Sequence, residues 1–501
     1  MKATDRPNEP ATPTAGAPEA GATGHGSPKS GTPVAGSTGT RVRPARLRYW
    51  ILAMLFVVTT INYADRSTLS IAGDSMQKDL GVSSGELGLL FSAFSWSYLI
   101  AQLPGGWMLD RYGSKKVYGA GIFLWSVFTM LQGAIGFFSG AAVALLFVLR
   151  FAVGAAEAPS FPGNSRIVAA WFPTRERGTA AALFNSAQYF ATVAFSPLMG
   201  WLVVTLGWEH VFTVIGGVGV LLALLWTKVI HPPRSHPRMT EAELDHIGEG
   251  GALIDMDQPA AEDLGPEDSR ARAEATSVRA NLRHVGKMLA HRTMLGVFVG
   301  QYFINTITWF FLTWFPVYLV QERGMSILEA GVVASLPALC GFAGGVLGGF
   351  LSDRLARRGM TLTAARKTPI VVGLLLSTTI LVCNYVSASW LVVGIMALSF
   401  FGKGLGALGW AVMADISPQQ ISGLAGSVFN AFGAVAGIVT PIVIGYMIDA
   451  TGSFDLALVF VGACAAMAVV SYLFIVKDIR RLDLADIDSA TAPPATSAPA
   501  A

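Results

Sequence analysis

Hydrophobic residues are grouped along the chain into long blocks that alternate with short polar turns. Twelve of these blocks are about 20 residues long, which is enough helix to cross a lipid bilayer. Gly, Ala and Ser are frequent within them, as expected where helices pack closely in lipid. The blocks are centred near Thr60, Trp96, Val127, Phe151, Phe190, Gly219, Trp309, Ala338, Leu375, Gly402, Ala434 and Ala465. The pattern predicts an all-α polytopic membrane protein with 12 transmembrane helices.

A long polar stretch in the middle of the chain separates six blocks from the other six. It covers residues 231–291, is rich in Pro and charge, and contains one short helix-like piece at 240–244. We therefore expect two six-helix bundles joined by a cytoplasmic central loop. Both ends of the chain are rich in Ala, Pro and Thr, a composition typical of disordered tails. The predicted boundaries are an N-terminal tail at 1–45, bundles at 46–230 and 292–478, the loop at 231–291 and a C-terminal tail at 479–501.

Composition agrees with a membrane protein, and the distribution of charge predicts its orientation. Of the 501 residues 52% are hydrophobic and only 13% are charged, about half the charge of a soluble domain. Basic residues gather before the first block and after the second, fourth and eighth, whereas the opposite turns carry few. The positive-inside rule then places both termini in the cytoplasm. We expect a multi-pass protein of the bacterial inner membrane, with no nucleic-acid partner.

Two of the apolar blocks carry charged residues near their centres. The first contains Asp65 and Arg66 side by side, and the fourth contains Arg150 and Glu157, seven residues apart and therefore on one helix face. A charge at the centre of a bilayer is costly unless it is paired or hydrated, so such residues indicate a functional site. Arg grips carboxylates with two parallel hydrogen bonds, and carboxyl groups exchange protons. This set suits a protein that couples proton flow to anion flow.

A repeated motif supports the division into two halves. The sequence Gly-x-x-x-Asp-Arg, followed by a basic pair, occurs after the second block with Asp110 and Arg111, and again after the eighth with Asp353 and Arg354. Equivalent motifs in two six-helix halves are typical of transporters built from repeats. We interpret these four residues as gate residues at cytoplasmic helix ends, where salt bridges can lock one state. Arg166 belongs to the same class.

The motif after the second block resembles the signature loop of the major facilitator superfamily. The charged pairs resemble those of its anion:cation symporter branch, and further runs resemble the bacterial glucarate/galactarate:proton symporters, with the D-galactonate transporters as cousins. The resemblance covers residues 46–480. The runs that carry it are Leu69-Ser-Ile-Ala-Gly73, Ala158-Pro-Ser-Phe-Pro-Gly-Asn-Ser-Arg166, Phe184-Asn-Ser-Ala-Gln-Tyr-Phe190 and Gly402-Lys-Gly404.

The resemblance implies a monomer that takes up a sugar acid anion together with protons. Arg66 and Arg150 are expected to hold the substrate, although each could instead pair with an acid purely to hold structure. Asp65 and Glu157 are expected to carry protons, and the alternative is a fixed ion pair that never titrates. An anion that occupies the Arg would release the acid to take a proton. We expect no cofactor; the coupling ion is H⁺.

Neutral polar residues supply candidate contacts for the sugar hydroxyls. Polar side chains also hold membrane helices together, so a structural role competes with binding for Gln188 and Asn430 and is favoured for Gln301 and Asn305. Lys403, between two glycines in the tenth block, either extends toward the cytoplasm or supplies the second cation that a six-carbon diacid requires. The positions that align with substrate contacts in the galactonate branch are Tyr63, Tyr98, Gln188, Trp410 and Asn430.

Other functions fit less well. A galactonate, hexuronate or tartrate carrier, or an anion exchanger, remains open because one cavity residue can change the substrate. An intramembrane enzyme needs catalytic or metal-binding residues in the apolar blocks, yet the sequence has no His-Glu-x-x-His motif and no His within them. A sensor without transport needs a folded signalling domain, for which the loop and tails are too short. The leading hypothesis is proton-coupled uptake of glucarate and galactarate by alternating access.

Overall fold

The structure is a computed structural model that describes residues 47–137, 140–256, 278–418 and 421–483. The predictions for the N-terminal tail and for the chain after Asp483 lie outside these residues. The described part is helical throughout, and none of its residues belongs to a strand. The all-α prediction is therefore confirmed for the described chain.

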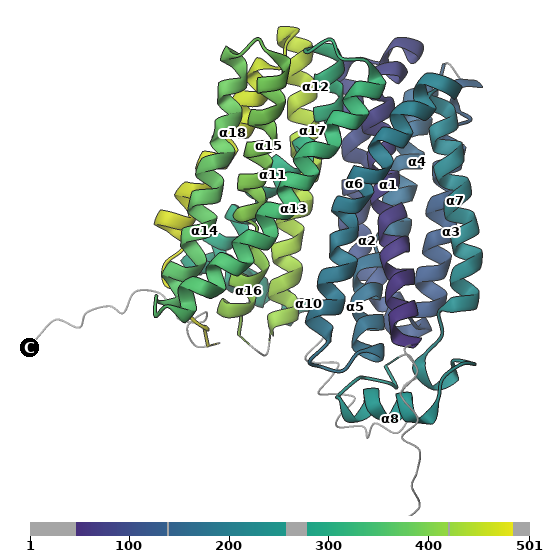
Figure 1. Ribbon diagram of the computed structural model, residues 1–501, viewed down its shortest axis with the longest axis vertical. Helices are drawn as coiled ribbons and strands as arrows, with labels where there is room; N and C mark the ends of the chain where they lie inside the picture. The colour runs from purple at the N-terminus through teal and green to yellow at the C-terminus, as the bar shows by residue number, and fades with distance from the viewer. Residues whose placement is uncertain (1–46, 138–139, 257–277, 419–420, 484–501) are drawn as a thin grey trace, which may run out of the picture. The chain divides into compact units, whose positions relative to one another are not determined.

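The first half consists of seven helices that follow one another through short turns (Figure 1). They are α1 (Leu47–Leu80), α2 (Ser84–Tyr112), α3 (Ser114–Gln132), α4 (Ala142–Glu157), α5 (Ser160–Trp171), α6 (Arg177–Leu206) and α7 (Trp208–Val229), with the short turn η1 (Ile135–Phe137) before α4. Glycines with positive φ, Gly113 and Gly207, form the tight turns at two of the junctions.

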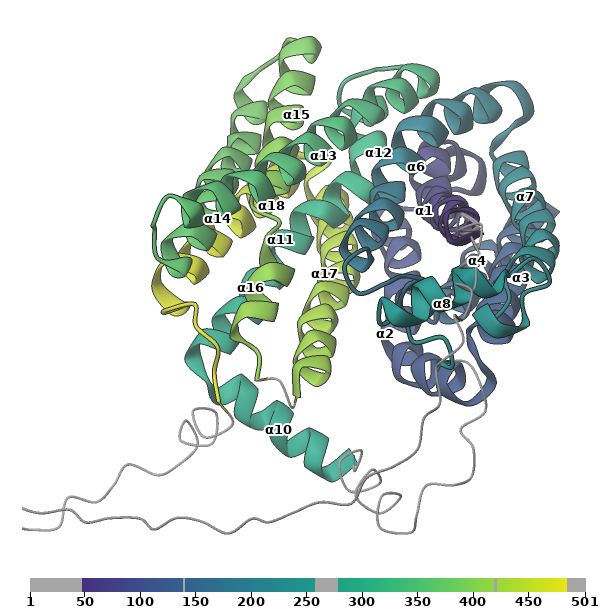
Figure 2. The same cartoon turned by 60° about the horizontal axis from the view of Figure 1, so that its bottom comes forward.

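The second half has a similar series of helices, several of them broken within one span. They are α11 (Arg292–Thr313), α12 (Phe315–Gln321), α13 (Ile327–Arg357), α14 (Leu362–Ser377), η3 (Thr378–Tyr385), α15 (Ser389–Leu405), α16 (Gly409–Ile416), α17 (Ser422–Thr451), α18 (Asp455–Val470) and η5 (Ser471–Ile475). The part of the chain that connects the two halves contains η2 (Pro233–Ser235), α8 (Glu241–Glu249) and α10 (Val278–Ala290). Figure 2 shows α10 running across the ends of the second-half helices.

Ten helical segments of the described chain are long and apolar enough to cross a membrane, and α2 raises the number to 11 when the parts on either side of its bend are taken together. The helix of the first half that falls short is α3. It has 19 residues, and Lys115 and Lys116 occupy its first turn, which leaves a short apolar segment. The prediction of a helical membrane fold is thus confirmed, whereas the predicted number of 12 spans is not.

The two halves meet where α2 packs along α17 and α6 packs along α13. Several hydrogen bonds between the halves lie at the end of the molecule where α1 finishes and α2 begins, which we call the Leu80 end. There the Asp449 carboxylate accepts from the backbone N–H groups of Ser84 and Gly85 at 2.9 and 2.7 Å. Gln321 of α12 donates to Asp74 of α1 at 3.1 Å.

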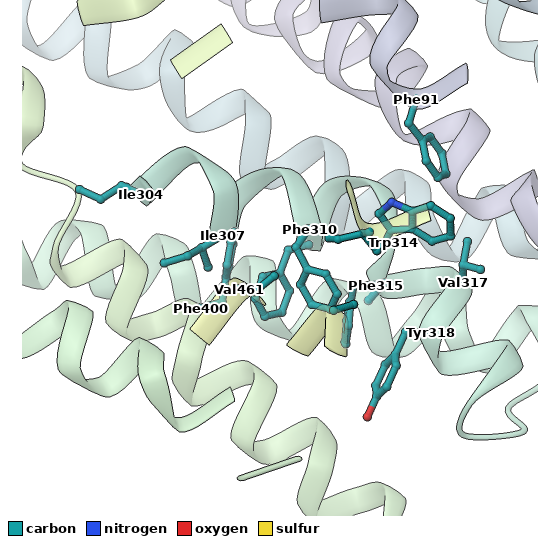
Figure 3. Packing of buried hydrophobic residues seen from close by; sticks show 14 of the residues in the cluster. Phe91, Ile304, Ile307, Phe310, Trp314, Phe315, Val317, Tyr318, Phe400 and Val461 are labelled. Atoms are coloured by element: carbon teal, nitrogen blue, oxygen red, sulfur yellow. The ribbon is translucent and has the colours of Figure 1, made fainter. Parts of the chain in front are cut away.

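The largest apolar cluster surrounds the junction between α11 and α12. Figure 3 shows Phe310, Trp314 and Phe315 of this junction among residues of neighbouring helices. The Trp314 ring meets Phe91 of α2 edge-on at 5.3 Å and its N–H donates to the Pro441 carbonyl oxygen of α17. Because Pro316 cannot donate a backbone hydrogen bond, it lies at the start of a new helix, where the missing N–H matters least. The cluster therefore joins the halves at a helix break.

The central segment differs from the prediction of a polar loop with a helix-like piece at 240–244. Its residues 231–256 fold onto the first half, with α8 nine residues long (Figures 1 and 2). The Glu243 side chain is fully buried and accepts hydrogen bonds from the backbone N–H groups of Leu47 and Arg48. A carboxylate at these N–H groups stabilises the start of α1. The segment is thus a folded cap on the first half.

The beginning of the expected C-terminal tail is also folded. Ile479 and Leu482 are buried, and the Leu482 N–H donates to the carbonyl oxygen of Ile416 at 3.0 Å. The Ile479 N–H donates to the Thr363 hydroxyl of α14 at 2.8 Å, so the segment is bound to both α14 and α16. Residues 479–483 therefore pack against the second half, although the disordered tail was expected to begin at residue 479.

Candidate functional site

Arg66 of α1 and Glu157 of α4 form a buried ion pair inside the first half. Arg66 Nε donates to Glu157 Oε2 at 3.0 Å, and Nη2 lies 2.9 Å from the same oxygen. The Glu157 side chain is fully buried. The guanidinium carbon also lies 4.8, 4.5 and 5.2 Å from the ring centres of Tyr63, Phe94 and Tyr98. The cation is therefore held by one acid and surrounded by three aromatic rings.

Arg150 and Asp65 form a looser second pair beside the first. Their charged groups are 4.0 Å apart, and Arg150 also donates to the backbone carbonyl oxygens of Asp65 and Arg66 at 3.4 and 3.2 Å. The hydroxyl of Thr129 on α3 donates to Asp65 Oδ1 at 2.8 Å. The four charged residues form one cluster, in which Asp65 and Arg150 both act electrostatically on Glu157.

The chain places Glu157 at a helix break. Glu157 is the last residue of α4, and Pro159 follows two positions later, where it removes a backbone donor and interrupts the helix before α5. Gly154, one turn earlier, lies so close to α2 that a Cβ would come 2.3 Å from the Phe94 carbonyl oxygen. This close approach brings α4, with Arg150 and Glu157, against α2 and allows both side chains to reach α1.

Each acid of the cluster keeps one oxygen without a hydrogen bond. Asp65 Oδ2 and Glu157 Oε1 are buried, and neither has a hydrogen-bond partner among the described residues. Asn62, one turn before Arg66 on α1, likewise has neither amide atom bonded within the described chain. Buried polar groups are normally paired, so such atoms indicate a place for a proton, a water or a ligand. The arrangement leaves room for protonation of both acids.

A cavity lies between the halves, next to this cluster. It has a volume of about 70 Å³, above the roughly 10–15 Å³ that one water molecule requires. Its walls come from α1, α6, α11, α12, α13 and α15. The polar residues that line it include Tyr63, Ser67, Gln188, Thr192, Thr308 and Lys403. A cavity with an apolar lining and a few polar groups is the usual form of a small-molecule site.

Tyr63 connects the cavity with the charged cluster. Its ring lines the cavity and also lies 4.8 Å from the Arg66 guanidinium carbon. The side chains of Arg66 and Arg150 are only 8% and 4% exposed, and neither residue lines the cavity. For Arg66 to reach a ligand in the cavity, its bond to Glu157 must loosen and the Tyr63 ring must shift.

The structure disperses the other residues expected to contact substrate. Gln188 lines the cavity with Tyr63, whereas Tyr98 stacks on Phe94 at 5.4 Å within the first half. Trp410 of α16 is 55% exposed and meets Phe429 of α17 edge-on at 4.9 Å. Asn430 is half-buried on α17. The direct binding role of these residues stays a prediction.

The four expected gate residues lie at the ends of α2 and α13. Asp110 pairs with Arg166 of α5, which also donates to Ser114 at 3.3 Å. Asp353 pairs with Arg366 of α14 at 3.4 Å, and Arg366 bonds Asp415 at 2.8 Å. Both ion pairs join helices of the same half. Arg111 contacts the rings of Trp107 and Tyr112 at 5.6 and 5.8 Å, and Arg354 is exposed.

Sequence reasoning missed several polar residues at the site. Thr129 and Ser67 lie in helices where single hydroxyl groups are common, and their importance follows only from which neighbour they face. Thr192 of α6 lines the cavity one turn after Gln188. The spacing of Gln188 and Thr192 was the one available signal, since residues four apart share a helix face. Within the described chain, no cluster of three or more His, Cys, Asp or Glu residues could hold a metal ion.

Comparison with known proteins identifies the family. The family model described as Major Facilitator Superfamily matches residues 55–365, which is more than half of the chain. The chain belongs to the major facilitator superfamily. The prediction from the sequence is therefore confirmed. Because the chain has the fold of this superfamily and many helices apolar enough to cross a membrane, it is a multi-pass protein of the bacterial inner membrane.

Relatives within the superfamily carry names that refer to sugar acids. The probable galactarate/D-glucarate transporter GudP of Bacillus subtilis (strain 168) is 60% identical over 439 residues, covering 87% of this chain and 94% of its own. Its namesake from Escherichia coli (strain K12) is 58% identical, with 87% and 95% covered. A D-galactonate transporter of Escherichia coli O6:H1 is 41% identical, with 88% and 98% covered.

Solved structures of other transporters share the fold. A bacterial homologue of the human lysosomal transporter Spinster, inward-facing and unoccupied, superposes with a TM-score of 0.66 at 17% identity, covering 90% of this chain and 99% of its own. The xylose transporter XylE of E. coli in its inward open conformation gives 0.64 at 14% identity, with 88% and 99% covered. At these identities the likeness establishes the fold alone.

Proposed function

We propose that this protein is a proton-coupled symporter that imports the sugar diacids galactarate and D-glucarate. The observation that carries the proposal is the buried cluster of Asp65, Arg66, Arg150 and Glu157 beside a polar-lined cavity between the halves. The names of the relatives that are 58 and 60% identical supply the substrate class. In this proposal the protein is a monomer with 12 spans, α3 being the twelfth, and both termini are cytoplasmic.

The geometry suggests how binding and protonation are coupled. In this structure Arg66 is neutralised by Glu157. A substrate carboxylate that binds Arg66 takes over this role, and a proton on Glu157 then removes the charge that is left unpaired. Asp65 and Arg150 act in the same way, with a substrate carboxylate on Arg150 and a proton on Asp65. The site is therefore stable either with acid paired to Arg or with substrate on Arg and proton on acid, since any other state leaves a buried charge without a partner.

Energetics favour two protons for each dianion. Moving one negative charge inward against 100 mV costs about 2.3 kcal/mol, so a dianion costs about twice that. One proton on Asp65 and one on Glu157 make the transported unit neutral, and the pH gradient alone then drives uptake. With a monoanion, the same two protons carry one net positive charge, and the membrane potential adds to the driving force.

The test is uptake by purified protein in proteoliposomes with imposed gradients. Labelled galactarate, D-glucarate and D-galactonate are compared at fixed voltage with and without a pH gradient, inside alkaline. We expect accumulation of both diacids only when the pH gradient is present, and little effect of voltage on their rates. Accumulation that ignores the pH gradient excludes proton coupling, and a marked preference for galactonate shifts the assignment to the galactonate branch.

A further inference from the structure

Lys403 is a buried cation that the coupling scheme does not use. It lies in the last turn of α15, is 9% exposed, and lines the cavity together with Tyr63 and Gln188. Among the residues that the structure describes, no carboxylate lies within ion-pair distance of its ammonium group. The centre of the Phe400 ring lies 5.1 Å from Nζ.

The two glycines that flank Lys403 fix the direction in which it faces. A Cβ on Gly402 would come 2.4 Å from the Gly373 carbonyl oxygen of α14, and a Cβ on Gly404 would come 2.1 Å from the Gly341 carbonyl oxygen of α13. These contacts press α15 against two neighbouring helices at the same level. The remaining side of α15 is the one that faces the cavity, and Lys403 occupies it.

The protein environment compensates the charge of Lys403 only in part. The carbonyl oxygens at the end of α15 and the face of the Phe400 ring both attract a cation, but each effect is small compared with the loss of hydration of a buried ammonium group. A side chain directed into bulk water would avoid this penalty. A buried lysine without an acid, in the wall of a cavity, therefore marks a place where an anionic ligand completes the site.

We propose that Lys403 binds the second carboxylate of the substrate and so selects sugar diacids over sugar monoacids. This inference rests on the proposed function. A six-carbon diacid differs from the corresponding monoacid by carrying a carboxylate in place of a terminal hydroxymethyl group, which adds one negative charge. Arg66 is on the first half and Lys403 on the second, so a diacid held by both bridges the halves. A monoacid leaves Lys403 without its counter-ion.

The experiment compares Lys403→Met, Lys403→Arg and Lys228→Gln with the wild type in proteoliposomes. Lys228 is an exposed lysine in the last turn of α7 and serves as the matched control. Counterflow of galactarate, D-glucarate and D-galactonate is measured side by side, with the midpoint of thermal unfolding of each purified protein. We expect Lys403→Met to lower the ratio of diacid to monoacid kcat/KM at least tenfold, and Lys403→Arg to retain most of it.

The unfolding measurement separates a binding role from a structural one. Removal of an uncompensated buried charge should leave the ligand-free protein as stable as the wild type, while stabilisation by added galactarate is lost and that by galactonate is kept. Equal loss of diacid and monoacid transport, an unchanged ratio, or unfolding of both Lys403 variants overturns the inference while the proposed function stands. Failure of the wild type to transport any of the three acids overturns the proposed function itself.

Discussion

Both nitrogens through which Arg66 contacts Glu157 meet the same carboxylate oxygen, Oε2, at 3.0 and 2.9 Å. The arrangement is not the parallel two-oxygen pairing in which arginine binds carboxylate most strongly. It leaves Oε1 buried and without a hydrogen-bond partner in the described chain. The pair is thus held at one oxygen and open at the other, which suits an acid that must alternate between a bound cation and a proton.

Replacement of Glu157 by Gln should abolish accumulation but preserve exchange. The amide resembles the protonated acid and leaves Arg66 free for substrate, so binding and counterflow continue while no proton can be carried. We expect gradient-driven galactarate uptake to fall at least tenfold, with counterflow reduced by less than about threefold. Parallel uptake and counterflow assays measure the difference. Equal loss of both activities would mean that Glu157 only holds structure.

Thr129 should set the pH at which uptake declines. Its hydroxyl hydrogen-bonds the ionised form of Asp65, and hydrogen bonds to charged groups contribute about 1.5–3 kcal/mol. Loss of this bond favours the protonated form of Asp65, so the alkaline limb of the uptake profile should move to higher pH by about 1–2 units in Thr129→Val. Thr129→Ser keeps the hydroxyl and serves as the control. A profile that is identical in the Val and Ser variants contradicts the assignment.

Asp449 should stabilise the state in which the Leu80 end is closed. Its carboxylate accepts two backbone hydrogen bonds from the start of α2, across the two halves. Loss of these exposed bonds in Asp449→Ala should favour the opposite state by about 1 kcal/mol, a change of about fivefold in the population ratio. Accessibility of a cysteine introduced near Ser84 to an aqueous reagent would report the change.

Glu86 provides a control on the same helix end. Its carboxylate accepts from the N–H of Ser83 within the first half, and among the described residues no hydrogen bond or ion pair joins it to the second half. Glu86→Gln should therefore weaken the start of α2 without altering the balance between states. A similar rise in accessibility in Glu86→Gln and Asp449→Ala would show that helix capping, and not the contact between halves, is responsible.

The cap formed by residues 231–256 should loosen in acid. Burial lowers the pKa of the His236 imidazole, and the neighbouring His231 lowers it further; burial and then Lys115 lower the pKa of His231. The docked form binds fewer protons than the undocked form, whose His pKa is about 6.5. Docking is thus fully stable above that pH and weakens as the pH falls below it. Limited proteolysis across pH 5–8 measures the change.

Two substitutions separate this effect from general acid sensitivity. His236 contacts the rings of Trp171 and His231 at 5.6 and 5.3 Å, so His236→Gln should flatten the pH dependence of cleavage. His246 is exposed on α8, and His246→Gln should cleave like the wild type at every pH. An unchanged pH dependence in His236→Gln would assign the effect to other groups.

The sequence was sufficient to find the charged residues of the site but not their pairing. Asp65 and Arg66 are adjacent in the chain, yet Arg66 contacts Glu157, 91 residues away, and Asp65 faces Arg150. Neighbours on a helix point in directions about 100° apart, so adjacent side chains meet different helices. Which of them meets which partner depends on the rotation of α1 and α4, and this is set by packing that a single sequence does not reveal.

The fold of the central segment also depends on contacts that the sequence does not reveal. Its polar composition favoured a loop with one helix-like piece at 240–244, and in the structure Thr240 caps α8 there. The buried position of Glu243 could not be predicted, because its partners are the backbone N–H groups of α1, almost 200 residues earlier. The sequence shows that Glu243 is charged, but its burial depends on the start of α1, which is far away in the chain.

Two close main-chain approaches also join the halves near the Leu80 end. A Cβ on Gly88 would come 2.4 Å from the Pro441 carbonyl oxygen, and one on Gly331 would come 2.7 Å from that of Ser196. A single added methyl group at Gly88 or Gly331 would collide with the backbone of the other half. Closing this end of the molecule therefore depends on the absence of a side chain at these two positions.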